Sequence, residues 1–86
     1  MARGGGEPSH DAAEAAARQS YGKLVAFLAA QTRDVAAAED AVAEAFASAL
    51  ADWPRSGIPA SPEAWLMQAA RRKFIDASRR RRTAHD

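Results

Sequence analysis

The sequence of 86 residues contains no cysteine, so neither a disulfide nor a thiolate metal site can stabilise it. Only 7% of the residues are aromatic, and no apolar run approaches the roughly 18 residues that a membrane-spanning helix requires. Residues 1–8 are rich in glycine and polar, and they lack the apolar segment of a signal peptide. We therefore expect one small soluble domain in the cytoplasm, without a membrane partner.

Catalytic and metal-binding patterns are also missing. His10 and His85 lie near opposite ends of the chain with no second ligand nearby, so we expect both to be solvated. No nucleophile, base and acid occur in a usable arrangement, and Gly4–Gly6 precede no strand, which argues against a phosphate-binding loop. The sequence thus predicts neither an enzyme nor a bound metal or cofactor.

Alanine-rich segments with helical spacing, and no strand pattern, predict an all-α fold, a compact bundle of about three helices. We expect a flexible leader over residues 1–10, a helical domain over residues 11–82, and the start of a linker or tail over residues 83–86. The three helices are expected at residues 11–31, 35–51 and 62–80.

Each expected helix has an apolar stripe that would lie on one face. Small alanines in these stripes allow the helices to approach one another closely. The stripes consist of Ala17, Tyr21, Leu24, Val25 and Leu28; of Val35, Ala38, Val42, Ala45, Phe46 and Ala49; and of Trp65, Leu66, Ala69, Ala70, Phe74 and Ala77.

Capping residues indicate where the helices begin. Ser9 or Asp11 can cap the first helix, and Asp34 can cap the second. Ser61 followed by Pro62 is typical of the start of a helix, because proline fits the first helical position.

The segment between the second and third helices is expected to be a loop from Asp52 to Ser61. Two prolines and a glycine in this segment disfavour regular structure. Trp53 and Ile58 are expected to anchor the loop through apolar contacts. Trp53 could either plug the bundle or line a pocket for a nucleic-acid base.

The charge is divided along the chain. Residues 1–54 have four basic and eight acidic side chains, a net charge of −4, whereas residues 55–86 have eight basic and three acidic ones, a net charge of +5. The acidic part includes Glu39, Asp40 and Glu44 in a helix without a nearby lysine or arginine. These acids could be solvated, could pair with the basic helix of the same fold, or could form a docking face for a basic partner.

The basic part is concentrated in the third helix. Arg71, Arg72 and Lys73 are contiguous, and the run Arg79–Arg82 follows about two turns later, with Phe74 and Ile75 in between. Cations that neutralise phosphates, next to groups that stack on bases, are typical of nucleic-acid binding. A solvated basic tail is the simpler alternative, and Trp65 and Phe74 are expected to belong to the core.

Two blocks of residues resemble region 2 of extracytoplasmic-function (ECF) sigma factors. The first block is Ala38-Glu39-Asp40-Ala41-Val42-Ala43-Glu44-Ala45-Phe46. The second includes Ala64-Trp65-Leu66, Ala70-Arg71-Arg72, Ile75-Asp76 and Arg79-Arg80. The resemblance covers about residues 17–82, and both blocks occur in the family's order.

The resemblance implies a transcription initiation domain that docks on core RNA polymerase and recognises and melts the promoter −10 element. Its acidic helix would bind the β′ clamp coiled coil, and its basic helix would hold the −10 non-template strand, with one base flipped into a pocket formed by the loop. An anti-sigma factor is a further partner that the resemblance allows. The polymerase-binding positions are Glu39, Asp40 and Glu44, and the DNA-binding positions are Trp53, Gln68, Arg71, Arg72, Lys73, Asp76, Arg79 and Arg80.

The sequence departs from the family at some positions. Arg72 stands where asparagine is common, which favours a phosphate contact over a base contact there. Region 4, which such a factor also needs, does not follow the domain, so we expect the chain to be an N-terminal piece of a longer protein. Two alternatives to this function are a nucleic-acid-binding module without sequence preference and a helical protein-interaction module.

Overall fold

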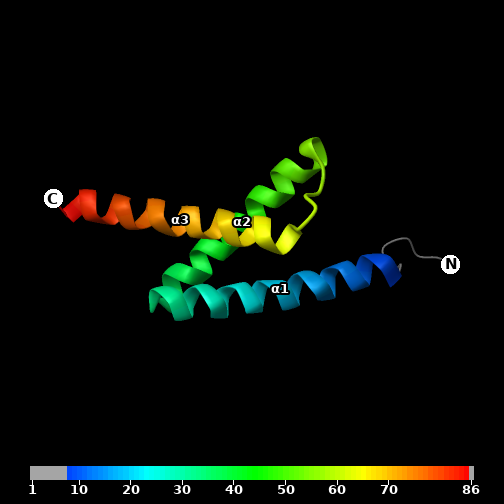
Figure 1. Ribbon diagram of the computed structural model, residues 1–86, viewed down its shortest axis with the longest axis horizontal. Coiled ribbons are helices and arrows are strands. Elements are labelled where there is room, and N and C mark those ends of the chain that lie inside the picture. Colours follow the sequence, from blue (N-terminus) through cyan, green and yellow to red (C-terminus); the bar gives the residue numbers. More distant parts are fainter. Residues whose placement is uncertain (1–7, 86) are drawn as a thin grey trace.

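The computed structural model describes residues 8–85, and their side chains from residue 17 to residue 83. It contains three helices, α1 (Pro8–Thr32), α2 (Val35–Ser56) and α3 (Pro62–His85). In Figure 1, α1 and α3 run in the same direction, and α2 runs obliquely from the end of α1 and crosses α3. The all-α fold with three helices that the sequence predicts is confirmed.

Helices α1 and α3 are both longer than the sequence predicted. Because α1 begins at Pro8, Ser9 and Asp11 lie inside the helix, and the prediction that one of them caps it is wrong. The alanine-rich sequence continues helical structure in both directions, and α3 extends through residues 83–85 of the expected tail. Residues 1–7 of the expected leader lie outside the described residues.

The turn between α1 and α2 is stabilised by local hydrogen bonds. Arg33 has a positive φ of 62°, and its backbone N–H donates to the Ala29 carbonyl at 2.7 Å. Asp34 then adopts an extended conformation, and its side chain accepts from the Ala37 N–H at 3.0 Å. This bond satisfies one of the free N–H groups at the start of α2, and it confirms Asp34 as the N-cap.

The end of α2 contradicts part of the loop prediction. The helix continues to Ser56 with Pro54 inside its last turns, so residues 52–56 are helical. Pro54 has no N–H to donate to the Leu50 carbonyl, so α2 loses one backbone hydrogen bond near its end. The Ser56 hydroxyl donates to the Asp52 carbonyl at 3.0 Å and closes the final turn.

The connection to α3 is consequently short. Gly57, with φ of 93°, ends α2, and its N–H donates to the Trp53 carbonyl at 2.8 Å. Ile58 is 71% exposed and does not anchor the connection as the sequence predicted. The Ser61 carbonyl accepts the first helical hydrogen bond of α3, from Trp65 N–H at 3.0 Å, and Pro62 is the first helical residue, as predicted.

The core is formed by small residues of α2 between larger residues of α1 and α3. Val35 is 60% exposed and Ala17 is exposed, so both were wrongly assigned to the apolar stripes, whereas Ala41 is buried and was missed. Val35 is the first residue of α2 and precedes the region where the helices pack. The buried residues are Leu24, Leu28, Ala38, Ala41, Val42, Ala45, Ala49, Leu66 and Ala70.

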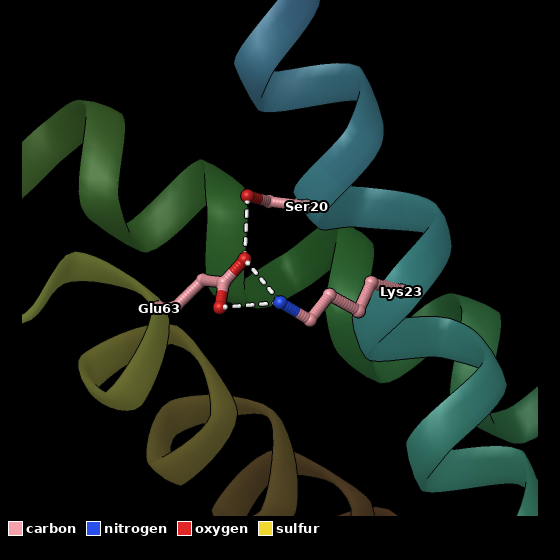
Figure 2. A network of polar contacts seen from close by, with 3 residues as sticks. All are labelled: Ser20, Lys23 and Glu63. Atoms are coloured by element: carbon pink, nitrogen blue, oxygen red, sulfur yellow. Dashed lines mark hydrogen bonds and ion pairs between the residues drawn. The ribbon is translucent and has the colours of Figure 1, made fainter.

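Helix α2 packs against both other helices, whereas α1 and α3 touch each other only locally. Polar contacts join α1 to α3: the Ser20 hydroxyl and the Lys23 ammonium donate to the Glu63 carboxylate at 2.9 and 3.2 Å (Figure 2). These donors, chiefly Ser20, lower the pKa of Glu63 below its ordinary value of 4.5. Arg71 also donates to the Gln31 side chain, at 3.4 Å.

Membrane-spanning and metal-binding features are absent from the described residues. Within that part of the chain, no helix is long and apolar enough to cross a bilayer. Nor do three or more histidine, aspartate or glutamate side chains of those residues gather closely enough to hold a metal ion.

Candidate nucleic-acid interface and docking face

The acidic face of α2, defined as Asp40 and Glu44, is exposed to solvent, and Glu39 is exposed about 100° around the helix from Asp40. Asp40 and Glu44 are four residues apart and therefore lie one turn apart on the same side of the helix. Among the described side chains, the ion pairs within 4.0 Å are Lys23–Glu63 and Arg55–Asp52, and neither involves this face or Glu39. The three carboxylates are thus available to a basic partner.

The acidic face nevertheless has cations of the same chain as neighbours. Asp40 and Glu44 line a small cleft of about 90 Å³ together with Lys73 and Arg81 of α3. The sequence left open whether the acids pair with the basic helix. The structure brings the two charge types together across this cleft without forming an ion pair within 4.0 Å.

The outer face of α3 consists of Gln68, Arg72, Ile75 and Arg79. Their spacing of four, three and four residues places them on one side of a helix, and all four are exposed. Ile75 is 51% exposed between the two arginines. Asp76 and Arg80 are exposed as well. This surface combines two cations, an amide and an apolar side chain.

The contiguous cations Arg71, Arg72 and Lys73 do not share a face, because successive helical residues are about 100° apart. Arg71 turns toward α1 and donates to Gln31. Arg72 is exposed on the outer face, whereas Lys73 is half-buried and turns toward α2. The three residues are adjacent in the sequence, but their side chains lie on different sides of α3.

A second, larger cleft between α2 and α3 adjoins the outer face of α3. It has a volume of about 160 Å³ and combines an aromatic wall with acidic, basic and hydroxyl groups. Carboxylates accept and cations donate hydrogen bonds, so the cleft can pair with a ligand that has both donors and acceptors. It is lined by Ser48, Asp52, Trp65, Ala69, Arg72, Lys73 and Asp76.

Trp53 and Trp65 form one aromatic pair between α2 and α3. Their ring centroids are 5.3 Å apart and their planes are inclined by 68°, an edge-to-face arrangement. Trp53 is half-buried against the core and its indole N–H is buried without a hydrogen-bond partner among the described residues. The sequence allowed Trp53 either to fill space in the bundle or to line a pocket for a base, and its packing against the core favours the first. Trp65 and Phe74 pack against the core, as predicted.

An apolar groove between α1 and α3 was not predicted. It has a volume of about 670 Å³, and Phe27 on its wall is 53% exposed. Phe27 does not belong to the apolar stripe of α1. An aromatic residue outside that stripe was the signal in the sequence that could have indicated an exposed apolar groove. The groove is lined by Lys23, Leu24, Ala26, Phe27, Ala30, Ser61, Glu63, Ala64 and Met67.

Comparison with known proteins adds to this geometry. Residues 16–84 match the family model for sigma-70 region 2. An uncharacterized protein of Rhizobium meliloti (strain 1021) is 40% identical over 62 residues, which make up 72% of this chain and 14% of that protein. The chain thus corresponds to a small part of this relative's length. No solved structure matches the chain at a significant level.

Proposed function

This chain belongs to the sigma-70 region 2 family, and from that membership we propose that it docks on core RNA polymerase and recognises and melts the promoter −10 element. The observation that supports the proposal most directly is the division of charge between two packed helices. The acids Asp40 and Glu44 of α2 and the cations Arg72 and Arg79 of α3 occupy separate exposed surfaces of one packed helix pair. One unit can therefore bind a basic protein surface and a polyanion together.

Polymerase docking is proposed for the acidic face together with Glu39. Glu39, Asp40 and Glu44 are exposed and have no ion-pair partner within 4.0 Å among the described side chains, so they keep their charge available. A basic coiled coil that lies along α2 would form charge-assisted hydrogen bonds with them. Such charge complementarity mainly gives specificity and a fast association.

Promoter binding is proposed for the outer face of α3. Arg72 and Arg79 lie on this face seven residues apart, or about 10 Å along the helix, and each can reach a phosphate of the non-template strand. Ile75 between them offers an apolar surface to an unpaired base. Gln68, Asp76 and Arg80 are exposed on or beside the same face and complete the proposed surface.

Base capture is proposed for the cleft of about 160 Å³ between α2 and α3 rather than for the loop before α3. Its volume suits a single base, and Trp65 offers an aromatic wall while Asp52 and Asp76 offer acceptors for an exocyclic amino group. Extruding a base from the duplex costs a few kcal/mol, which these contacts would have to offset. In this proposal Trp53 packs edge-to-face against Trp65 and holds that ring in place. Lys73 is part of the lining of the same cleft.

We also propose membership of the ECF subfamily, in which an anti-sigma factor is an expected regulator. The proposal relies on the two residue blocks, which lie in the first half of α2 and along most of α3. The matched region corresponds to 14% of the length of the Rhizobium meliloti relative, so an activity of a whole protein is not part of this proposal.

The test is complex formation with a fragment that contains the β′ clamp coiled coil, measured by co-elution from a sizing column at low salt. The variant Asp40→Lys/Glu44→Lys reverses two charges of the acidic face and should abolish the complex. The control Asp52→Lys/Asp76→Lys makes the same change in net charge in the neighbouring cleft and should retain it. Both variants need the helical circular dichroism of the wild type.

The outcome separates the proposal from its alternatives. A complex that is lost only in the Asp40/Glu44 variant supports docking through α2. No complex with the wild type would contradict the proposal and favour a nucleic-acid-binding module without sequence preference. That module would bind single strands of any sequence equally well, which titration with a −10 strand and a scrambled strand measures directly.

A further inference from the structure

Helices α2 and α3 bring two acids and two cations to the same small cleft. Asp40 and Glu44 come from successive turns of α2, and Lys73 and Arg81 come from α3, two turns apart. Small side chains of Ala37, Ala41 and Ala77 form the remainder of the lining, so no bulky group separates the charges. The four charged groups sum to zero.

The charges are neighbours but do not form closed ion pairs. Asp40, Glu44 and Arg81 are exposed, Lys73 is half-buried, and the ion pairs within 4.0 Å in the described part of the chain involve other residues. Unlike a closed pair, such an arrangement leaves the carboxylates free to accept hydrogen bonds. The cations still reduce the negative potential that an approaching partner meets, and they repel cations of that partner.

We propose that Lys73 and Arg81 determine the affinity and specificity of the acidic face by opposing the approach of basic partners from the α3 side. The inference rests on the proposed docking function. A partner that binds well must direct its own cations to Asp40 and Glu44 while keeping them away from α3. A basic surface with charges spread at random would meet Lys73 and Arg81 and bind less well.

This role differs from a direct contact with DNA phosphates. Lys73 also lines the larger cleft next to Asp52 and Asp76, so acidic side chains of α2 and α3 surround it on both sides. Lys73 is half-buried, and both clefts that it lines also contain carboxylates. Removing Lys73 and Arg81 should therefore strengthen docking, which is the opposite of what a stabilising contact to the partner would give.

The experiment measures the affinity of the domain for the β′ clamp coiled-coil fragment by isothermal titration calorimetry at low and high salt. The variant Lys73→Gln/Arg81→Gln removes both cations of the cleft, and Arg18→Gln/Arg82→Gln removes two exposed cations elsewhere with the same change in net charge. We expect the cleft variant to bind about two- to fivefold tighter than the control at low salt, and equally at high salt.

Two additional variants keep the test decisive. Lys73→Arg/Arg81→Lys retains both charges and should bind like the wild type. Should Lys73→Gln/Arg81→Gln fail to fold, Arg81→Gln alone, at an exposed position, should still bind more tightly than Arg82→Gln.

The result also separates this inference from the docking proposal. Equal or weaker binding of the cleft variant relative to the control, with a wild type that binds and an Asp40→Lys/Glu44→Lys variant that does not, overturns this inference alone. Absence of binding by the wild type overturns both.

Discussion

The separation of Arg72 and Lys73 on α3 predicts different effects from two neighbouring cations. Each substitution to alanine removes one positive charge, so long-range effects on DNA affinity should be similar. Only a side chain that contacts a phosphate releases a counterion and contributes to the salt dependence of binding. We expect such contacts from Arg72 and Arg79, which are exposed on the outer face, and not from Lys73, which turns toward α2.

The expected magnitude follows from how many phosphates each variant no longer neutralises. For single-stranded DNA, each neutralised phosphate contributes about 0.7 to the slope of log affinity against log salt. A fourfold increase in salt therefore weakens binding by about 2.6-fold per phosphate. Arg72→Ala and Arg79→Ala should each reduce the slope by about 0.7, and the double variant by about 1.4. Lys73→Ala should leave the slope of the wild type unchanged.

The assay is fluorescence anisotropy with a labelled single-stranded oligonucleotide that contains a −10 sequence, titrated over a series of salt concentrations. Circular dichroism and thermal unfolding confirm that each variant is folded. A slope for Lys73→Ala that falls as much as that for Arg72→Ala would refute the assignment of faces, because it would require Lys73 to contact the strand. Unchanged slopes for Arg72→Ala and Arg79→Ala would remove the outer face from the DNA interface.

Three further predictions concern stability. Ala45→Leu, at a position with 0% exposure, should destabilise the fold by about 1–3 kcal/mol and lower Tm by about 4–24 °C. Ala47→Leu, on the exposed side of α2, should change Tm little. Equal melting temperatures of the two variants would contradict the close packing of α2. Because its pKa is lowered in the fold, Glu63 should stabilise the fold above its ordinary pKa of 4.5 and lose this effect as the pH falls through the lowered value. Urea unfolding of Glu63→Gln should therefore show a smaller loss of stability on acidification than the wild type, and identical pH profiles would show that the contact has no effect. Asp34→Ala should cost about 1 kcal/mol while Asp34→Asn retains the cap, as thermal unfolding can test; equal losses in both would argue against a capping role.

Local signals predicted the parts of the fold that depend on local interactions. Asp34 and Pro62 indicated the starts of α2 and α3 because a cap and a first-turn proline act within a few residues. Pro54 gave a misleading signal: near the end of a helix it removes a single hydrogen bond, and α2 continues past it to Ser56. The periodicity of α2 identified a buried face but not where packing begins, so Val35 was wrongly included.

The sequence offered a set of candidate site residues but not their arrangement. Charge and spacing pointed to the acidic residues of α2 and to the basic helix, and the structure exposes Glu39, Asp40 and Glu44 but leaves Lys73 half-buried. Which cations face solvent depends on the angle at which α2 crosses α3, and no local pattern encodes that angle. For the same reason the sequence could not indicate that Lys73 and Arg81 lie beside Asp40 and Glu44, since the two helices contribute them from distant parts of the chain.

The aromatic pair gives the molecule an internal optical probe. The chain contains two tryptophans, and both belong to the edge-to-face pair at 5.3 Å. All of the intrinsic indole emission therefore originates where α2 meets the start of α3, next to the cleft proposed for a base. Glu44 is nine residues from Trp53, about 14 Å along α2, so binding at the acidic face lies beyond direct contact with either ring. Unlabelled protein can thus report events at one end of the helix pair while remaining optically insensitive to contacts at the other.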